Sequence, residues 1–188
     1  MSDLLLSSVI GTAAGIIGTG IGGAVGFFLK NPSRRFLSTL LSFSSGLMIS
    51  VVCFDLLPEA FEMGGVKAGI LGIIIGVGVI MSCEQLINTV SSPKKGNGFL
   101  KTGILLGVGI ALHNLPEGLA IGSGFTAYEA YGLGLSIVIA LHDIPEGIAM
   151  AIPLNIAGVG KFKVFLYTLL AGVPTGIGAL IGYLLGEI

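Results

Sequence analysis

The sequence predicts an all-α fold: a single transmembrane domain, built as a polytopic bundle of six helices. Two observations lead to this fold class. The 188-residue chain is 53% hydrophobic and only 10% charged, with a mean hydropathy of +1.01, whereas a soluble domain carries about 25% charged residues. The chain also contains six apolar runs that each supply the roughly 20 helical residues needed to cross a bilayer.

The six runs define the predicted helices and leave no room for a soluble domain between them. The first run is too long and too rich in glycine to be a cleaved signal peptide, so we expect it to stay as the first helix. The connections "KNPSRR" and "SSPKKGNG" carry residues typical of turns, and because they are short, consecutive helices should be antiparallel. The predicted helices cover residues 4–29, 36–58, 66–88, 99–124, 128–152 and 163–186.

The positive charges predict the orientation of this bundle. Of the nine Lys and Arg residues, all but Lys67 fall in the three connections on one side of a six-pass chain. Cytoplasmic loops of membrane proteins carry such an excess, so the N-terminus and the end of the sixth helix should face outward. The residues on the cytoplasmic side are Lys30, Arg34, Arg35, Lys94, Lys95, Lys101, Lys161 and Lys163.

Glycines recur at a spacing of four residues in several predicted helices. Residues at this spacing share a helix face and let neighbouring backbones approach closely. We interpret these stripes as packing surfaces, and the alternative that some faces slide during transport is left open. The spaced sets are Gly18, Gly22 and Gly26; Gly72 and Gly76; Gly103 and Gly107; Gly172 and Gly176; and Gly178, Gly182 and Gly186.

Two stretches in the fourth and fifth predicted helices are near copies of each other. "IALHNLPEGLAI" covers residues 110–121 and "IALHDIPEGIAM" covers residues 139–150. In each, a histidine precedes a glutamate by four residues, so the two side chains project from one helix face. The pairs are His113 with Glu117 and His142 with Glu146, and the residue after each histidine is Asn114 or Asp143.

These polar clusters need a compensating positive charge, from a proton or a metal ion, and a metal ion is the better explanation. An ionisable group at mid-membrane depth costs about 2.5 kcal/mol or more, and no Lys or Arg lies near this depth in either helix. Two imidazoles and two carboxylates form a four-coordinate set that Zn²⁺ accepts, and a divalent ion cancels both carboxylate charges. The alternative is that each His–Glu pair only forms a hydrogen bond within the bundle.

The residues around the paired motif extend this hypothesis. Asn114 and Asp143 add oxygen atoms, so a second ion bridged by Glu117 and Glu146 could lie beside the first. Pro116 and Pro145 lack the backbone N–H that would donate a hydrogen bond to the carbonyl oxygen one turn earlier in the helix. Broken helices are tolerated at membrane depth where they line a polar cavity, which favours an accessible path over a sealed site.

These motifs resemble the ZIP family of divalent metal transporters, its bacterial members in particular. "HNLPEG" and "HDIPEG" carry the resemblance, and "LLPEAFE" and "GALIGYLLGE" support it. The resemblance implies an eight-helix fold with a metal site between the fourth and fifth helices. By motif position it implies that the primary ion is held by His113, Glu117, His142 and Glu146, and a second ion by Asn114, Asp143 and the two glutamates. Met48 falls where some relatives have a methionine near the primary ion, although a packing role is the simpler interpretation.

The sequence departs from the family pattern in three places. Six helices are predicted instead of eight, so we expect the last two to be lacking from this chain. Thr175, within "AGVPTGIGA", stands where relatives often have a glutamate, which predicts a second metal site that is weaker or absent. The connection between the third and fourth helices lacks the histidines often found there.

Acidic residues near the helix ends are candidates for a metal pathway. Asp55 and Glu59, with Glu62 beyond them, could form an acidic entrance that concentrates cations. Glu84 could line an exit. Ordinary solvated or interfacial positions are the alternative for these residues.

The function predicted from these features is transport of divalent metal ions into the cytoplasm, with Zn²⁺ first and Fe²⁺, Mn²⁺ or Cd²⁺ as alternatives. A metal-binding membrane subunit or sensor that does not transport, and an intramembrane metalloenzyme with Asp143 as base, are the competing hypotheses. We do not expect an enzyme.

The predicted partners are metal ions and the lipid bilayer, and the predicted location of the chain is the cell membrane. A net charge of −1 argues against nucleic acid as a partner. Homo-oligomerisation is left open.

Overall fold

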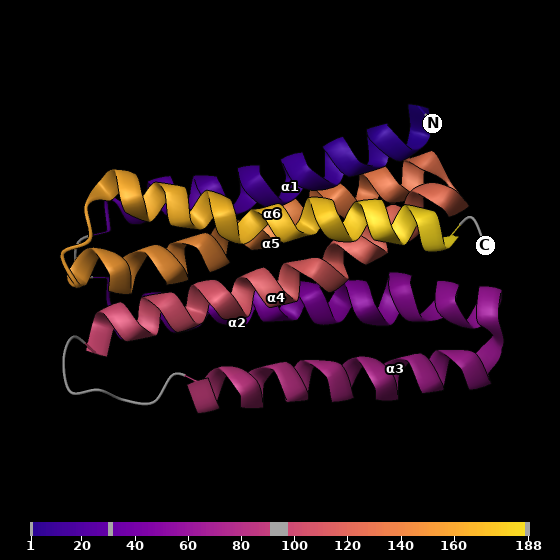
Figure 1. Ribbon diagram of the computed structural model, residues 1–188, viewed down its shortest axis with the longest axis horizontal. Helices are drawn as coiled ribbons and strands as arrows, with labels where there is room; N and C mark the ends of the chain where they lie inside the picture. Colours follow the sequence, from indigo (N-terminus) through magenta and orange to yellow (C-terminus); the bar gives the residue numbers. More distant parts are fainter. Residues whose placement is uncertain (1, 30–31, 91–97, 187–188) are drawn as a thin grey trace.

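The computed structural model describes residues 2–29, 32–90 and 98–186 as a bundle of helices (Figure 1). No strand occurs among these residues, so the predicted all-α fold class is confirmed. The elements in chain order are α1 (Ser2–Gly26), α2 (Arg34–Val51), the π-helical turn η1 (Val52–Leu56), α3 (Leu57–Val90), α4 (Gly98–Ala127), α5 (Glu129–Ile156) and α6 (Lys161–Gly186).

The helices alternate in direction, as the short connections predict. In Figure 1 the start of α1 and the end of α6 lie at one end of the bundle, and the end of α3, the start of α4 and the connection between α5 and α6 lie at the other. Arg35, Lys101, Lys161 and Lys163 are close to these three connections, whereas Lys67 follows the turn at the opposite end. This separation of charge fits the predicted orientation, which itself remains a prediction.

Five helical segments of the described chain are long and apolar enough to cross a membrane: Asp3–Gly26, Leu57–Val79, Gly98–Ala127, Glu129–Ile156 and Lys161–Gly186. A sixth apolar segment, Ser38–Phe54, is shorter. The predicted end of the second helix at residue 58 is wrong. The helical backbone passes from α2 through η1 into α3 without a break and is first interrupted at Gly65, which has φ 74° and ψ 163°. This positive φ suits glycine, which lacks a Cβ, and it separates the two arms of α3.

The other predicted helix ends differ by a few residues from the structure. α1 begins and ends slightly earlier than expected, while α4 and α5 extend further, to Ala127 and Ile156. α5 continues through Pro153, where the sequence favoured an end. Prolines are tolerated inside transmembrane helices when neighbouring helices satisfy the freed backbone groups.

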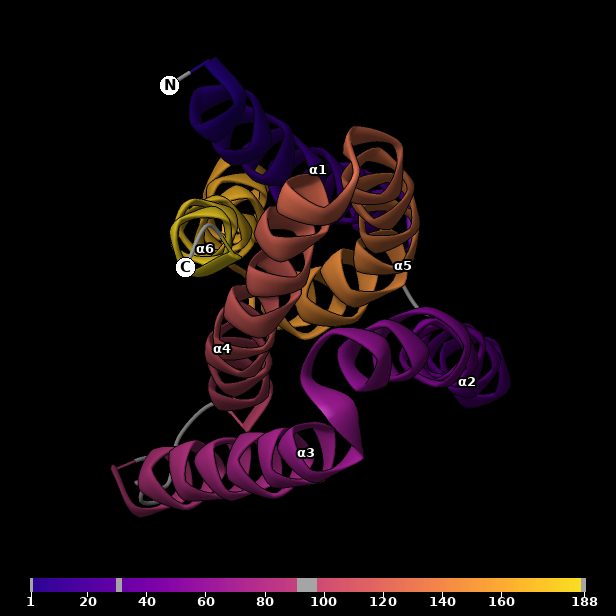
Figure 2. The same ribbon diagram turned by 90° about the vertical axis from the view of Figure 1, so that its right-hand side faces the viewer.

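Four helices form the packed centre of the bundle. α1, α4, α5 and α6 lie together, and α2 and α3 lie to one side of them (Figure 2). Among the residues whose side chains are described, the buried apolar ones come from the central four helices, with Ile121 and Ile139 in one cluster and Leu154 and Val164 in another. None of the span 57–79 in α3 is buried.

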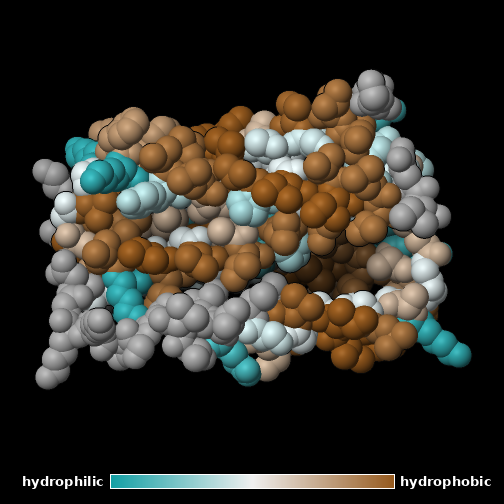
Figure 3. All heavy atoms as spheres, in the orientation of Figure 1, coloured by the Kyte–Doolittle hydropathy of each residue, from teal (hydrophilic) through white to brown (hydrophobic). Residues whose placement is uncertain are grey.

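The surface of the bundle is apolar over most of the face seen in Figure 3. Large hydrophobic side chains are exposed along α3 in particular, for example Ile74 at 62% and Ile75 at 64%. A soluble monomer rarely exposes a continuous apolar surface of this extent. The distribution is that of a protein whose solvent is the lipid bilayer.

Glycine allows the central helices to approach backbone to backbone. A Cβ at Gly118 of α4 would lie 2.8 Å from the carbonyl carbon of Thr175 in α6, and a Cβ at Gly22 of α1 would lie 2.8 Å from the Cα of Gly147 in α5. The glycine stripes of these helices therefore serve packing. Gly72 and Gly76 of α3 are different, because the structure leaves open space beside both.

Candidate metal centre

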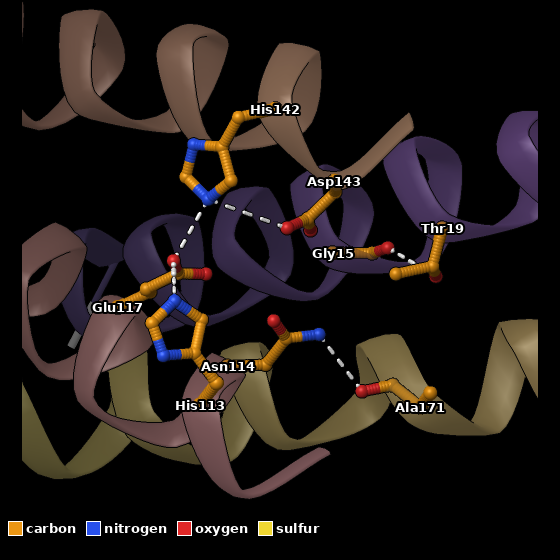
Figure 4. Close-up of polar contacts among 8 residues, drawn as sticks. All are labelled: Gly15, Thr19, His113, Asn114, Glu117, His142, Asp143 and Ala171. Carbon is orange, nitrogen blue, oxygen red and sulfur yellow. Dashed lines mark hydrogen bonds and ion pairs between the residues drawn. The ribbon is translucent and has the colours of Figure 1, made fainter. Parts of the chain in front are cut away.

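Two helices bring the paired motifs together at the centre of the bundle. His113 and Glu117 come from α4, and His142 and Asp143 come from α5 (Figure 4). The helical spacing of four residues places Nε2 of His113 3.0 Å from Oε1 of Glu117. The packing of α5 on α4 then places Nε2 of His142 2.7 Å from the same carboxylate oxygen.

Glu117 is consequently the meeting point of both motifs. Its Oε1 contacts one imidazole from each helix, and Oδ1 of Asp143 lies 3.5 Å from Nε2 of His142. Glu117, His142 and Asp143 offer ligand atoms that all lie within 4.8 Å of one another. Such a group satisfies the first geometric requirement of a metal site.

The convergent side chains differ in their access to solvent. Asp143 is 0% exposed, His142 2% and Glu117 9%, whereas the side chain of His113 is 40% exposed. The site therefore has a closed side formed by α5 and a more open side at His113. No Lys or Arg forms an ion pair with these carboxylates among the described residues, and the ion pairs of Glu117 and Asp143 are with the two histidines.

Asn114 is oriented by the neighbouring helix α6. The residue is fully buried, and its Nδ2 donates a hydrogen bond of 2.9 Å to the carbonyl oxygen of Ala171. Its Oδ1 accepts no hydrogen bond in the described structure. The hydrogen bond therefore holds the amide nitrogen against α6. The amide oxygen remains available as a ligand atom inside the bundle (Figure 4).

Several acceptor atoms at the centre have no donor. Oε2 of Glu117, both carboxylate oxygens of Asp143, Oε2 of Glu146 and Oδ1 of Asn114 are buried without a hydrogen-bond partner among the described residues. Buried polar groups in proteins are rarely left unsatisfied. An excess of acceptors over donors fits a site that binds a cation.

A cavity of about 180 Å³ leads to the centre from the side of α2. His113, Glu117 and His142 line its inner wall, and Met48 lines the same cavity. The remaining wall is apolar and includes Val51, Val52 and Leu56 of α2 and η1 and Leu135 and Ile139 of α5. The sequence analysis missed these apolar residues, because nothing in an apolar helix marks which side chains face a cavity.

Comparison with known proteins places this arrangement in a family. A family model described as ZIP zinc transporter matches residues 82–187. The zinc transporter ZupT of Clostridium perfringens is 33% identical over 219 residues, covering 98% of this chain and 76% of the relative. Those of Corynebacterium glutamicum and Streptococcus mutans are 35% and 33% identical, covering 90% and 98% of this chain and 72% and 77% of the relatives.

The chain belongs to the ZIP family. The part that the ZIP model matches includes α4, α5 and α6, so it contains every residue of the convergent group. The resemblance based on "HNLPEG" and "HDIPEG" is confirmed at the level of the family.

The remaining predicted site residues of this ZIP chain are placed as follows. Glu146 is partly buried on α5, one turn after His142, and neither it nor His113 belongs to the group within 4.8 Å. Glu59 is partly buried at the start of α3 and does not line the cavity at the metal centre. The side chains of Asp55 and Glu84 lie outside the described residues.

Proposed function

We propose that this chain transports divalent metal ions, zinc first among them, across the membrane into the cytoplasm. The proposed site lies between α4 and α5 and uses His113, Asn114, Glu117, His142, Asp143 and Glu146. The observation that carries the proposal is the position of Oε1 of Glu117, 3.0 Å from Nε2 of His113 and 2.7 Å from Nε2 of His142. One carboxylate oxygen thus stands between imidazoles of two different helices.

These spacings suit a bound metal ion. Zn²⁺ binds imidazole nitrogen at about 2.0–2.1 Å and carboxylate oxygen at about 2.0–2.2 Å in tetrahedral sites, so two ligand atoms of one ion lie about 3.4 Å apart. The contacts of Glu117 with the two histidines, and the 3.5 Å contact of His142 with Asp143, are close to that value. Small side-chain movements would exchange these contacts for metal–ligand bonds.

The ligand types are compatible with zinc and with other divalent ions. Imidazole suits Zn²⁺ and Fe²⁺, and carboxylate suits Mn²⁺ as well. The relatives reported above are named zinc transporters, which supports zinc as the first ion to test. Fe²⁺, Mn²⁺ and Cd²⁺ are the competitors that the test should include.

The surroundings of the centre favour a carrier of ions over an enzyme. A metalloenzyme needs a metal-bound water and room for an organic substrate beside it. The cavity at the centre has a volume of about 180 Å³ and largely apolar walls, which is small compared with the ~300–1,000 Å³ typical of small-molecule sites. The exposed side chain of His113 at the open side of the centre fits a site that an ion reaches and leaves.

The test is zinc uptake into proteoliposomes that contain the purified chain. The native chain is compared with His142→Ala, which removes the most buried imidazole, and with Glu129→Gln, a control that removes an exposed carboxylate at the start of α5. We expect uptake by the native chain and the control and at least a tenfold loss in His142→Ala. The same preparations are assayed for zinc binding and for hydrolytic turnover.

The three hypotheses predict different outcomes of this experiment. Zinc binding without uptake would favour the sensor or subunit, and turnover of a substrate would favour the enzyme. Uptake that His142→Ala leaves unchanged would show that ions cross elsewhere. The cell membrane as location follows from the proposed uptake and is tested by fractionating cells that express the chain.

A further inference from the structure

The first turn of α6 carries two lysines without an acidic partner. Lys161 and Lys163 are both exposed, and neither forms an ion pair with a carboxylate in the described parts of the chain. Phe162, the residue between them, is 78% exposed. Two unbalanced charges beside a large exposed aromatic ring indicate a surface that meets a partner with both an anionic and an apolar part.

The length of α6 places these lysines at the level of the lipid head groups. The apolar span Lys161–Gly186 has 26 residues, and at about 1.5 Å per residue it is roughly 39 Å long. The hydrocarbon core of a bilayer is only about 30 Å thick. Because charged side chains are unfavourable inside this core, the end of α6 that carries the lysines extends into the head-group region, where phospholipid phosphates lie.

The faces of α6 differ in what they contact. Val164, Thr168 and Ala171 are buried against the rest of the bundle. On another face, exposed residues recur at spacings of three and four, which makes them neighbours in one stripe along the helix. This stripe consists of Lys163, Leu166, Tyr167 and Leu170. Lys163 therefore stands at the head-group end of a stripe whose other side chains face the acyl chains of the bilayer.

Hydrophilic and apolar surfaces meet at this end of the bundle. Figure 3 shows hydrophilic side chains where α6 begins and apolar side chains further along the bundle. The stripe from Lys163 to Leu170 covers seven residues and is therefore about 10 Å long. That length reaches from the head groups into the first part of the acyl-chain region. A single lipid molecule can contact both ends of such a stripe.

The lysines do not stabilise the helix on which they lie. α1, α3 and α5 have an acidic residue in the first turn, namely Asp3, Glu59 and Glu129. A negative charge there interacts favourably with the partial positive charge at a helix N-terminus. α6 has no acidic residue in its first turn and has Lys161 and Lys163 instead, which is the unfavourable arrangement. An anion outside the chain would offset it.

We propose that Lys161 and Lys163 bind the phosphate of an anionic phospholipid, whose acyl chain lies along Leu166 and Leu170. Basic residues beside a membrane span attract anionic lipids. The amine of a zwitterionic head group already balances its own phosphate, so such a lipid offers the two lysines less. In the predicted orientation these lysines face the cytoplasmic leaflet, which is the leaflet that carries anionic lipids.

The continuity of the stripe favours a lipid over a soluble anion. A free phosphate would contact the lysines alone and would gain nothing from Phe162 or from the apolar side chains below Lys163. A phospholipid contacts the charged and the apolar parts together. The proposal concerns the outer surface of α6, so it is independent of which ion the chain transports.

The absence of tryptophan from the chain allows a fluorescent reporter to be placed at this surface. Phe162→Trp puts the reporter between the two lysines. Tyr128→Trp puts it at the opposite end of the bundle, where Tyr128 is also exposed. Each full-length variant is reconstituted in phosphatidylcholine mixed with either phosphatidylglycerol or phosphatidylcholine that is brominated near the glycerol end of its acyl chains. Bromine quenches a tryptophan that it contacts, so the quenching gives the relative affinity of each surface for the two lipids.

We expect the reporter at position 162 to show at least a threefold preference for phosphatidylglycerol, and the reporter at position 128 to show none. Replacing both lysines, by Lys161→Gln with Lys163→Gln in the Phe162→Trp chain, should lower the preference to about one. Lys67→Gln is the matched control, because it removes an exposed lysine at the opposite end, and it should leave the preference unchanged. Higher ionic strength should weaken the preference, because salt screens exposed charges.

Three results would overturn the proposal. The first is equal quenching by the two lipids at position 162 while both lysines are present. The second is a preference that survives the loss of both lysines or is equally strong at position 128. The third is a preference that inorganic phosphate abolishes at constant ionic strength, which would assign the lysines to a free anion.

Thermal unfolding of the unmodified chain provides a measurement without a reporter. A ligand that binds only the folded protein raises the unfolding midpoint. In detergent, phosphatidylglycerol should therefore raise the midpoint by several degrees more than phosphatidylcholine with the same acyl chains. Equal midpoints would contradict the proposal. This comparison decides it even where the chain that lacks Lys161 and Lys163 does not fold, and it leaves the proposed transport function untouched.

Discussion

Oε1 of Glu117 lies 2.7 Å from Nε2 of His142, although the two residues are 25 positions apart in the chain. The same oxygen lies 3.0 Å from Nε2 of His113. The two copies of the motif are therefore unequal in the structure. The glutamate of the first copy joins both histidines, while Glu146, the glutamate of the second copy, stands outside the closest group of ligand atoms.

This asymmetry predicts unequal effects of removing the two glutamates. We expect Glu117→Gln to lower zinc affinity at least a hundredfold, because it removes the one carboxylate that contacts both imidazoles. Glu146→Gln should lower the affinity by only about tenfold, because Glu146 stands outside the closest group of ligand atoms and contributes less to holding the ion. Isothermal titration of zinc into both purified variants measures the difference. Equal losses would mean that both glutamates hold the ion equally closely.

Zinc uptake should decrease as the medium becomes acidic. Metal ligands must be deprotonated, so protons compete with zinc for His113 and His142, and binding is stronger at higher pH. We expect uptake at pH 5 to be several-fold slower than at pH 7.5. The measurement is initial uptake into proteoliposomes at fixed zinc concentration and fixed ionic strength. Uptake that stays flat across this range would contradict histidine ligation during transport.

The glycines of α1 and α3 should differ in their tolerance of a side chain. A Cβ at Gly22 would meet the backbone of α5, whereas a Cβ at Gly76 would meet nothing within 4 Å. Overpacking typically costs about 1–3 kcal/mol, so Gly22→Ala should lower the unfolding midpoint by several degrees. Gly76→Ala is the matched control and should leave the midpoint unchanged or raise it, because alanine favours helix.

The charge distribution predicts which connections face the cytoplasm. Single cysteines are introduced at Tyr128, in the connection between α4 and α5, and at Gly160, between α5 and α6. The variants are expressed in cells with the native cysteines of the chain replaced by serine. A membrane-impermeant thiol reagent should label the cysteine at position 128 and leave the one at position 160 unlabelled. The reverse pattern would place the N-terminus in the cytoplasm.

Much of the fold could be predicted because its determinants are local. A run of about 20 apolar residues must form a helix in a bilayer, where every backbone group needs an internal hydrogen bond. The contact between His113 and Glu117 is also local, because residues four apart are neighbours on any helix. The corner at Gly65 was missed because a single glycine among others carries no local signal for its positive φ.

For the candidate site, the sequence predicts a set of residues, whereas their arrangement is seen only in the structure. The sequence by itself determined which residues could bind a metal, and that each motif presents its histidine and glutamate on one face. Only the tertiary structure decided that Glu117 meets His142 and that Ala171 orients Asn114. These relations depend on how closely and at what height the helices pack, which is set by backbone contacts at glycines far apart in the chain.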